Sequence, residues 1–188
     1  MDNLYNHPDK KTDVYQQVLF LLGGGAVSRF HTVPTARGVT VGHHQFHVAW
    51  FCYLLWDKTV LAPPVQLIMA ALSHDMAEQV WGDVPSPAKR LNGVSDTLER
   101  HEYQTLIDNN AYFPLTETEE YTLKLADLAA GMLECVVERG LGNKFVVEPF
   151  QRFAAYYREL GLGSLNISQE AQIYRAIQHL WEQANGKS

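Results

Sequence analysis

Four side chains that can bind a metal ion occur in strongly apolar parts of the sequence. His44 opens one apolar segment, and the pair His74-Asp75 interrupts a second. Asp127 lies in a third, within residues 125–130. A carboxylate is rarely buried without a partner, because removing its charge from water is costly. We therefore expect these four side chains to meet inside the folded protein.

Two imidazoles and two carboxylates make a mixed nitrogen and oxygen ligand set. Such a set suits Mn²⁺, Co²⁺, Zn²⁺, Fe²⁺ or Mg²⁺ and leaves positions open for water and a phosphate oxygen. A single buried histidine is more often an ordinary core residue, so the prediction depends on the four occurring together. Together they indicate a catalytic divalent-metal site.

Glu78 follows His74 by four residues, which in a helix places both on the same face, one turn apart. From there its carboxylate could orient or deprotonate a water molecule whose pKa the metal has lowered. The alternative is a solvated glutamate near a helix end.

Several cations could meet an anionic substrate at this site. Lys124 precedes Asp127 by three residues and shares its helix face. Arg29, Arg37 and Lys89 lie in expected loops that could close over the same place. The alternative interpretation of Arg29, Arg37 and Lys89 is that they are ordinary solvated cations on the protein surface.

The elements that would position these residues are mainly helices. Helical periodicity dominates and strand-like alternation is scarce, which predicts an all-α bundle of about seven helices. Three glycines at 23–25 are expected to end the first helix, and residues 23–42 to form a long loop. Capping boxes are expected at Asp96 with Glu99 and at Thr116 with Glu119. The expected helices cover residues 13–22, 44–56, 63–80, a stretch from 96, 116–140, 148–160 and 168–184.

Length and composition fit one globular domain. The chain has 188 residues, of which 46% are hydrophobic and 19% charged, and we expect a single domain over 1–188 with loose tails at 1–11 and 186–188. The apolar residues of 44–56 point in all directions, which predicts a central helix buried on most sides.

Charge and cysteine content exclude several classes of protein. A net charge of −6 argues against binding a nucleic acid polymer, which requires many cations. Cys52 and Cys135 sit in apolar helical patterns and are expected to be buried free thiols, as in a reducing cytosol. No signal peptide or membrane-spanning segment is expected, so we predict a cytoplasmic protein without a membrane partner.

Three motifs carry a family resemblance. Arg29-Phe30 precedes the stretch VGHHQFHVA at 41–49, HDMAEQVWGDVPSPAK fills 74–89, and Lys-Leu-Ala-Asp fills 124–127. On these motifs the chain resembles the HD-domain phosphohydrolases over residues 29–138. Within them it is similar to a small single-domain branch of bacterial 5′-deoxynucleotidases and phage dATP triphosphohydrolases.

The resemblance implies a role for each matching residue. The metal ligands would be His44, His74, Asp75 and Asp127. Glu78 and Asp83 would serve catalysis or contact the sugar. The residues that bind the substrate would be Arg29, Phe30, Lys89 and Lys124, with Arg37 and His43 as further candidates. The resemblance also implies a homo-oligomer in the cytoplasm of a bacterium or of a phage-infected host cell.

The chain departs from the family pattern at three places. Phe30 replaces the usual tryptophan, which keeps an apolar ring but loses the indole N–H donor. His43 replaces the usual glutamate, which removes a negative charge near the site and favours a more anionic substrate. Residues 31–34 match no family pattern, and we expect them to set base preference.

Three functions are compatible with these observations. The replacement of the usual glutamate by His43 favours a triphosphohydrolase that converts a dNTP, such as dATP, to deoxynucleoside and triphosphate. The first alternative is a 5′-deoxynucleotidase that releases phosphate from dNMPs. The second is a non-catalytic HD-like module that binds a nucleotide for regulation. Such a module would have lost a ligand or the acid/base carboxylate, whereas this chain retains the four ligands and Glu78, so an enzyme is favoured.

Overall fold

The computed structural model describes residues 14–30, 32–56, 62–84, 95–161 and 169–186. Within these ranges the regular elements are helices, accompanied by an isolated bridge between Ser28 and Thr40. Seven helices have nine or more residues and α4 is a single turn, so the predicted all-α fold is confirmed. The helices are α1 Val14–Ala26, α2 Val41–Leu55, α3 Val65–Ser73, α4 Glu78–Trp81, α6 Ser95–Asp108, α7 Glu117–Gly140, α8 Val147–Gly161 and α9 Gln169–Asn185.

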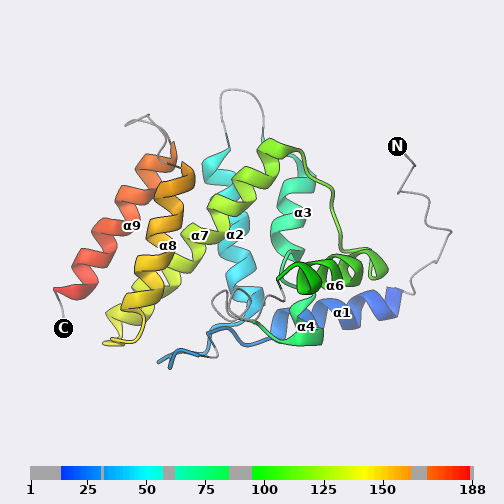
Figure 1. Ribbon diagram of the computed structural model, residues 1–188, viewed down its shortest axis with the longest axis horizontal. Coiled ribbons are helices and arrows are strands. Elements are labelled where there is room, and N and C mark those ends of the chain that lie inside the picture. The colour runs from blue at the N-terminus through cyan, green and yellow to red at the C-terminus, as the bar shows by residue number, and fades with distance from the viewer. Residues whose placement is uncertain (1–13, 31, 57–61, 85–94, 162–168, 187–188) are drawn as a thin grey trace.

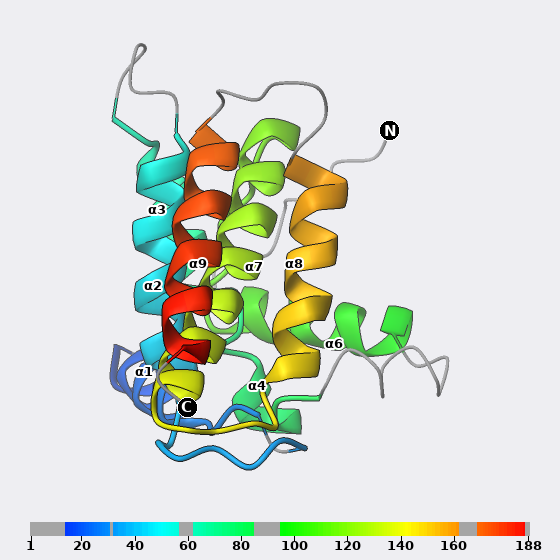
Figure 2. The ribbon, with the colours of Figure 1, turned by 90° about the vertical axis from the view of Figure 1, so that its left-hand side faces the viewer.

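The long helix α7 is the centre of the bundle, where it contacts α2, α3, α8 and α9 (Figure 1). Helices α2, α3, α7, α8 and α9 run side by side, while α6 lies crosswise at one end (Figure 2). The core between α2 and α7 includes Val48, Cys52, Leu125 and Ala129, all without exposed surface. This packing brings the polar residues of α2 and α7 together.

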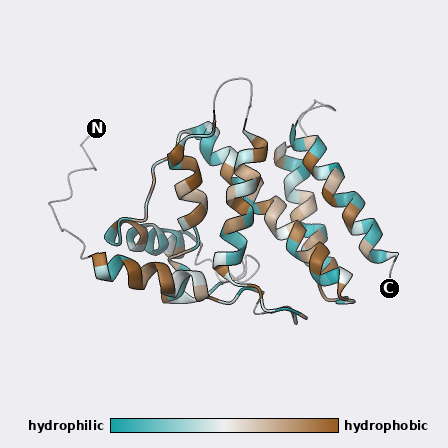
Figure 3. Cartoon of the chain, turned by 180° about the vertical axis from the view of Figure 1, so that it is seen from behind, coloured by the Kyte–Doolittle hydropathy of each residue, from teal (hydrophilic) through white to brown (hydrophobic). Residues whose placement is uncertain are grey.

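Helix α2 is central, but it is less buried than its sequence predicts. Val48 and Cys52 are fully buried, whereas the exposed fractions of Phe46 and Trp50 are 55% and 54%. The prediction of burial on most sides was therefore wrong for this outer face. Helix α1 also has exposed apolar residues, which are coloured brown in Figure 3. The homo-oligomer stays a prediction, and these two apolar faces are compatible with it.

The third predicted helix, 63–80, is broken in the structure. Helix α3 ends at Ser73, and α4 begins at Glu78. Between them the chain tightens, because the N–H groups of Met76 and Glu78 donate to the carbonyls three residues earlier, at 2.9 and 3.0 Å. Side chains three residues apart eclipse in such turns. Glu78 therefore shares its face with Asp75 and not with His74.

Helix α1 does not end at the three glycines but continues to Ala26, so that predicted end was wrong. The glycines allow close packing. A Cβ atom at Gly24 would lie 3.1 Å from the Cβ of Met76, and one at Gly42 would lie 3.0 Å from the carbonyl oxygen of Gly25. The missing side chains let α1 lie directly against the start of α2 and the turn before α4.

Helix α7 begins as predicted. The Thr116 hydroxyl accepts from the Glu119 N–H at 3.4 Å, and the Glu119 carboxylate accepts from the Thr116 N–H at 2.7 Å, which is a capping box. Helix α6 begins at Ser95, so Asp96 lies in its first turn and does not precede it as a cap. The predicted tails lie almost wholly outside the described residues.

Both cysteines are buried free thiols, as predicted. Burial raises the pKa of the Cys52 thiol to about 12, and burial likewise raises the pKa of Cys135. Both therefore stay protonated and unreactive at neutral pH. None of the helices in the described ranges combines the length and apolar character that crossing a membrane requires.

We predict that Gly42→Ala lowers the free energy of unfolding by about 1–3 kcal/mol, because the new methyl group overlaps the backbone of Gly25. Gly140→Ala is the matched control, since its methyl group would meet nothing within 4 Å. It should leave stability unchanged or raise it slightly. Urea denaturation of the three proteins measures this, and equal stability of the two variants would contradict the close packing of α1 on α2.

Candidate active site

The four predicted metal ligands lie together at the junction of α2, α7 and the turn after α3. The Nε2 atom of His44 is 3.1 Å from Asp127 Oδ1 and 3.8 Å from Asp75 Oδ2. The Nε2 atom of His74 is 3.4 Å from Asp75 Oδ1. Residues from three segments far apart in the sequence thus converge on one point.

Hydrogen bonds to Nδ1 orient both imidazole rings. The Nδ1 atom of His44 is 2.8 Å from Oε1 of the fully buried Glu134 on α7. The Nδ1 atom of His74 is 2.9 Å from the carbonyl oxygen of Ala71. Because both partners are acceptors, they assign a proton to Nδ1 in each ring. His44 therefore turns Nε2 toward Asp127 and Asp75, and His74 turns Nε2 toward Asp75.

This arrangement fits a divalent metal ion. One ligand atom each from His44, His74 and Asp75 lies within 4.8 Å of the others, and Asp127 lies beside His44. The Nε2 atom of His74 is buried and makes no hydrogen bond to the part of the chain that the structure describes. Buried polar atoms are nearly always satisfied, so this atom is suited to an ion.

Arg29 is held close to the same carboxylates. Its Nη1 atom donates to Asp75 Oδ2 at 2.5 Å, and its Nε atom is 3.9 Å from Glu134 Oε2. Burial opposes the charge on Arg29, but Asp75 and Glu134 outweigh it and raise its pKa, so it stays charged. A fixed cation therefore stands beside the candidate metal ligands.

Both aspartates are ionised at neutral pH. Burial opposes their charge, but His74 and Arg29 hold the pKa of Asp75 below its usual value. For Asp127, burial is likewise outweighed, first by the hydrogen bond from His44 and then by Lys124, so its pKa lies well below the usual value. The site therefore presents two carboxylate anions to a cation.

Arg29, Asp75 and Asp127 line a cavity of about 440 Å³, which is within the size range of small-molecule sites, whereas His44 and His74 lie behind the aspartates and do not line it. Its polar residues are Arg29, Thr32, Asp75, Glu78, Asp83, Lys124, Asp127 and Arg152. Its apolar and aromatic residues are Phe30, Val33, Val84, Leu128, Pro149, Phe153, Tyr156 and Leu160. The cavity can therefore receive a ligand with a charged part and an aromatic part.

The loop that carries Arg29 and Phe30 is fixed at two points. The N–H of Phe30, whose φ is 60°, donates to Asp83 Oδ2 at 3.1 Å. Further along, the N–H groups of Ala36 and Arg37 donate to Glu138 at 2.6 and 3.0 Å. Glu138 is fully buried and belongs to α7. Its two hydrogen bonds therefore attach the loop to the helix that carries Asp127.

Of the predicted substrate-binding residues, Arg29, Phe30 and Lys124 line the cavity, as do the predicted catalytic residues Glu78 and Asp83. The described residues that line the cavity do not include Arg37 or His43.

Lys89 and His31 lie outside the described residues. Thr32 and Val33, from the segment expected to set base preference, do line the cavity.

Two parts of the candidate site were not predicted from the sequence: Glu134, and the cavity wall formed by α8. Glu134 sits among apolar residues seven positions after Asp127, which is the same signal that identified Asp127. The wall formed by Arg152, Phe153 and Tyr156 of α8 carries no motif and depends on how α8 packs against α7. The first could have been found from the sequence, and the second could not.

Sequence comparison identifies bacterial relatives. No protein-family model matches the chain. A 5′-deoxynucleotidase of Citrobacter koseri is 27% identical over 144 residues, which is 62% of this chain and 69% of the relative. A 5′-deoxynucleotidase of Yersinia pestis is 23% identical over 148 residues, which is 65% of this chain and 73% of the relative.

Solved structures share the fold. An HD phosphohydrolase of cyanophage S-2L, DatZ, bound to dA and one catalytic Zn²⁺ ion, superposes with a TM-score of 0.58 at 19% identity. The match covers 94% of this chain and 98% of that one. An HD-domain phosphohydrolase of Listeria innocua gives 0.64 at 16% identity, over 93% and 99% of the two chains.

We predict that the metal-free protein loses stability as the pH rises from about 6.5 to about 9. Burial and Arg29 lower the pKa of His44, but hydrogen bonds to Asp127 and Glu134 outweigh them and raise it from 6.5 to about 9. The added stability is fully present below 6.5 and is lost through 9, and it amounts to roughly 3 kcal/mol.

Urea denaturation of the chelator-treated protein across this range measures the effect. The zinc-loaded protein is the control and should not show the same loss, because a ligating histidine is already unprotonated. A flat pH profile for the metal-free protein would contradict the bonding assigned to His44.

Proposed function

We propose that this chain, which has the fold of the HD-domain phosphohydrolases and is similar in sequence to 5′-deoxynucleotidases, is a metal-dependent 5′-deoxynucleotidase. The substrate would be a deoxynucleoside monophosphate, and the products a deoxynucleoside and phosphate. The observation that carries the proposal is the convergence of His44, His74, Asp75 and Asp127. The two aspartates of this group line a cavity that Arg29 and Glu78 also line.

The two kinds of cavity wall suggest how the substrate is oriented. Arg29 and Lys124 offer donors to phosphate oxygens beside the proposed metal ligands. Phe153 and Tyr156 on α8 offer aromatic surface to a base. Phe30 and Asp83 join the two regions, and we assign the deoxyribose to them.

The four ligands would hold a divalent ion, which supplies positive charge to the phosphate and makes water a stronger acid. Hydrolysis forms a bond from the water oxygen to phosphorus, breaks the bond from phosphorus to the 5′-oxygen, and moves a proton to that oxygen. Glu78, 7% exposed and on the same face as Asp75, is placed to accept the proton of the attacking water. Lys124, whose Nζ is 3.2 Å from Asp127 Oδ2, adds charge at the phosphate.

The structure weakens the case for a triphosphate substrate. That case depended on His43, which is among the described residues but does not line the cavity. Arg29 is already paired with Asp75, which reduces the charge it offers. The named curated relatives are 5′-deoxynucleotidases, which also favours the monophosphate.

The test is a panel of dNMPs, dNTPs and NMPs incubated with Mn²⁺, Co²⁺, Mg²⁺ or Zn²⁺, with products separated by chromatography. We expect orthophosphate from dNMPs, slower turnover of the ribonucleotides because Phe30 and Asp83 crowd a 2′-hydroxyl, and loss of activity with chelator. Release of intact tripolyphosphate from a dNTP, without turnover of dNMPs, would replace the proposal with the triphosphohydrolase. Binding without turnover of any nucleotide would favour the regulatory module.

We predict that Glu78→Gln lowers kcat by about 10²-fold or more while its metal content stays at the wild-type value, because an amide cannot accept the proton. Glu182→Gln on the exposed face of α9 is the matched control and should leave kcat unchanged. Steady-state kinetics and elemental analysis of purified protein measure both quantities. If Glu78→Gln lost its metal, Glu78 would have to be reassigned as a ligand.

A further inference from the structure

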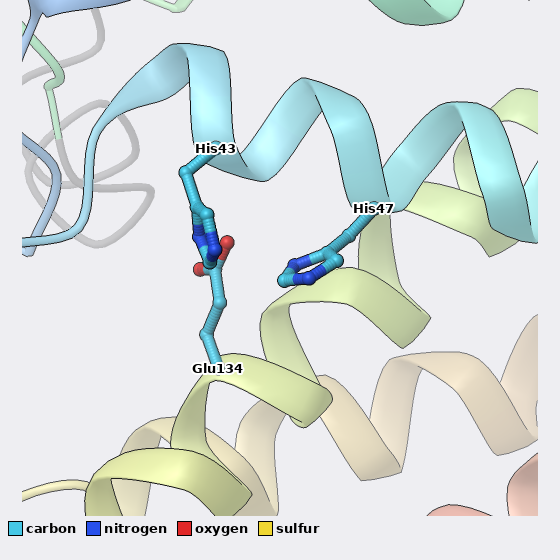
Figure 4. Close-up of side chains that lie close together, drawn as sticks. All are labelled: His43, His47 and Glu134. Atoms are coloured by element: carbon cyan, nitrogen blue, oxygen red, sulfur yellow. The ribbon is translucent and has the colours of Figure 1, made fainter.

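A second cluster of metal-binding side chains lies on the other side of Glu134. His43 and His47 are one turn apart on α2, and both face Glu134 across the gap to α7 (Figure 4). One ligand atom from each of the three lies within 4.8 Å of the other two. His43 precedes the candidate ligand His44 but points to this cluster and does not line the cavity.

Two buried atoms of this cluster make no hydrogen bond to the described residues: Nδ1 of His47 and Oε2 of Glu134. The carboxylate of Glu134 is fully buried, and its Oε1 is already bonded to Nδ1 of His44. Its Oε2 is 3.9 Å from Arg29 Nε, which is an ion pair but too long for a hydrogen bond. A buried carboxylate oxygen without a donor is costly, and a bound cation is one of the few groups that satisfies it.

We propose that His43, His47 and Glu134 bind a second divalent metal ion, for which Zn²⁺ is the best fit. Histidines at i and i+4 lie on one face of a helix and can bind the same ion. Two histidines and one glutamate are a known zinc ligand set, with the fourth position left to water. Zinc bonds of about 2.0–2.1 Å place tetrahedral ligand atoms about 3.4 Å apart, so the present spacing requires small side-chain movements.

The two sites would share Glu134. Its Oε2 would bind the second ion, while its Oε1 accepts the hydrogen bond that orients His44. Both histidines of the second site are half-buried, so an ion can reach them from solvent. The alternative is that the two imidazoles simply pack edge to face, with ring centroids 4.5 Å apart. Counting bound ions separates these two possibilities.

The experiment is a Zn²⁺ titration of the full-length, chelator-stripped protein, followed by elemental analysis after gel filtration. The wild-type protein should bind two ions per chain. Asp127→Ala removes a proposed ligand of the first site and should retain one ion. His47→Gln should also retain one, and the double variant Asp127→Ala/His47→Gln should retain none. His179→Gln on α9, an exposed histidine outside both clusters, is the matched control and should bind two.

One ion per wild-type chain, or an undiminished count in His47→Gln, would overturn the proposal. His43→Gln provides an independent variant should His47→Gln fail to fold, as judged by circular dichroism. In Asp127→Ala, Co²⁺ should give the visible absorption of a four-coordinate ion, and the His47→Gln change should abolish it. The count in Asp127→Ala does not depend on turnover, so it stands apart from the proposed deoxynucleotidase activity.

Discussion

The buried carboxylates of α7 require partners, and those partners are the parts of the candidate site. A fully buried anion is tolerated when N–H groups or cations surround it. Glu134 meets this requirement at one oxygen, through the ring of His44, and Glu138 meets it through the N–H groups of Ala36 and Arg37. The first contact orients a proposed metal ligand. The second ties down the loop that carries Arg29.

The carboxylates of the site are paired with cationic side chains, and a bound metal ion would replace part of this pairing. In the metal-free protein the cations Arg29, His44 and Lys124 pair with the carboxylates of Asp75, Asp127 and Glu134. An ion bound by the aspartates would take over part of this pairing and displace the second proton of His44. Arg29 would then have more of its charge available for a phosphate oxygen. Metal binding and phosphate binding should therefore support each other.

The sequence was sufficient to predict that His44, His74, Asp75 and Asp127 meet in the fold, because each stands out as a polar side chain in an apolar segment. It was also sufficient for the start of α7, since a capping box depends on residues three positions apart. Glu134 carries the same signal as Asp127, but its bond to His44 joins residues 90 positions apart. That contact depends on the packing of α2 on α7, which periodicity does not encode.

Three of the errors have similar causes. Glycines 23–25 resemble a helix end, yet here they permit close contact with Gly42 and Met76, so α1 continues through them. The apolar ring of α2 predicted burial on most sides, but neighbouring helices leave Phe46 and Trp50 exposed. His43 was expected to influence the substrate, whereas the rotation of α2 directs it toward Glu134. These three differences concern tertiary packing, whereas the break in the predicted helix 63–80 and the position of Asp96 inside α6 concern local structure.

The most direct test of the account is a crystal structure of the protein grown with Zn²⁺ and a deoxynucleoside monophosphate, with data collected at the zinc absorption edge. The account predicts an anomalous peak bound by His44, His74, Asp75 and Asp127 at about 2.0–2.2 Å. It also predicts the phosphate beside Arg29 and Lys124, and the base against Phe153 and Tyr156. A nucleotide bound elsewhere, or zinc absent from these four side chains, would contradict it.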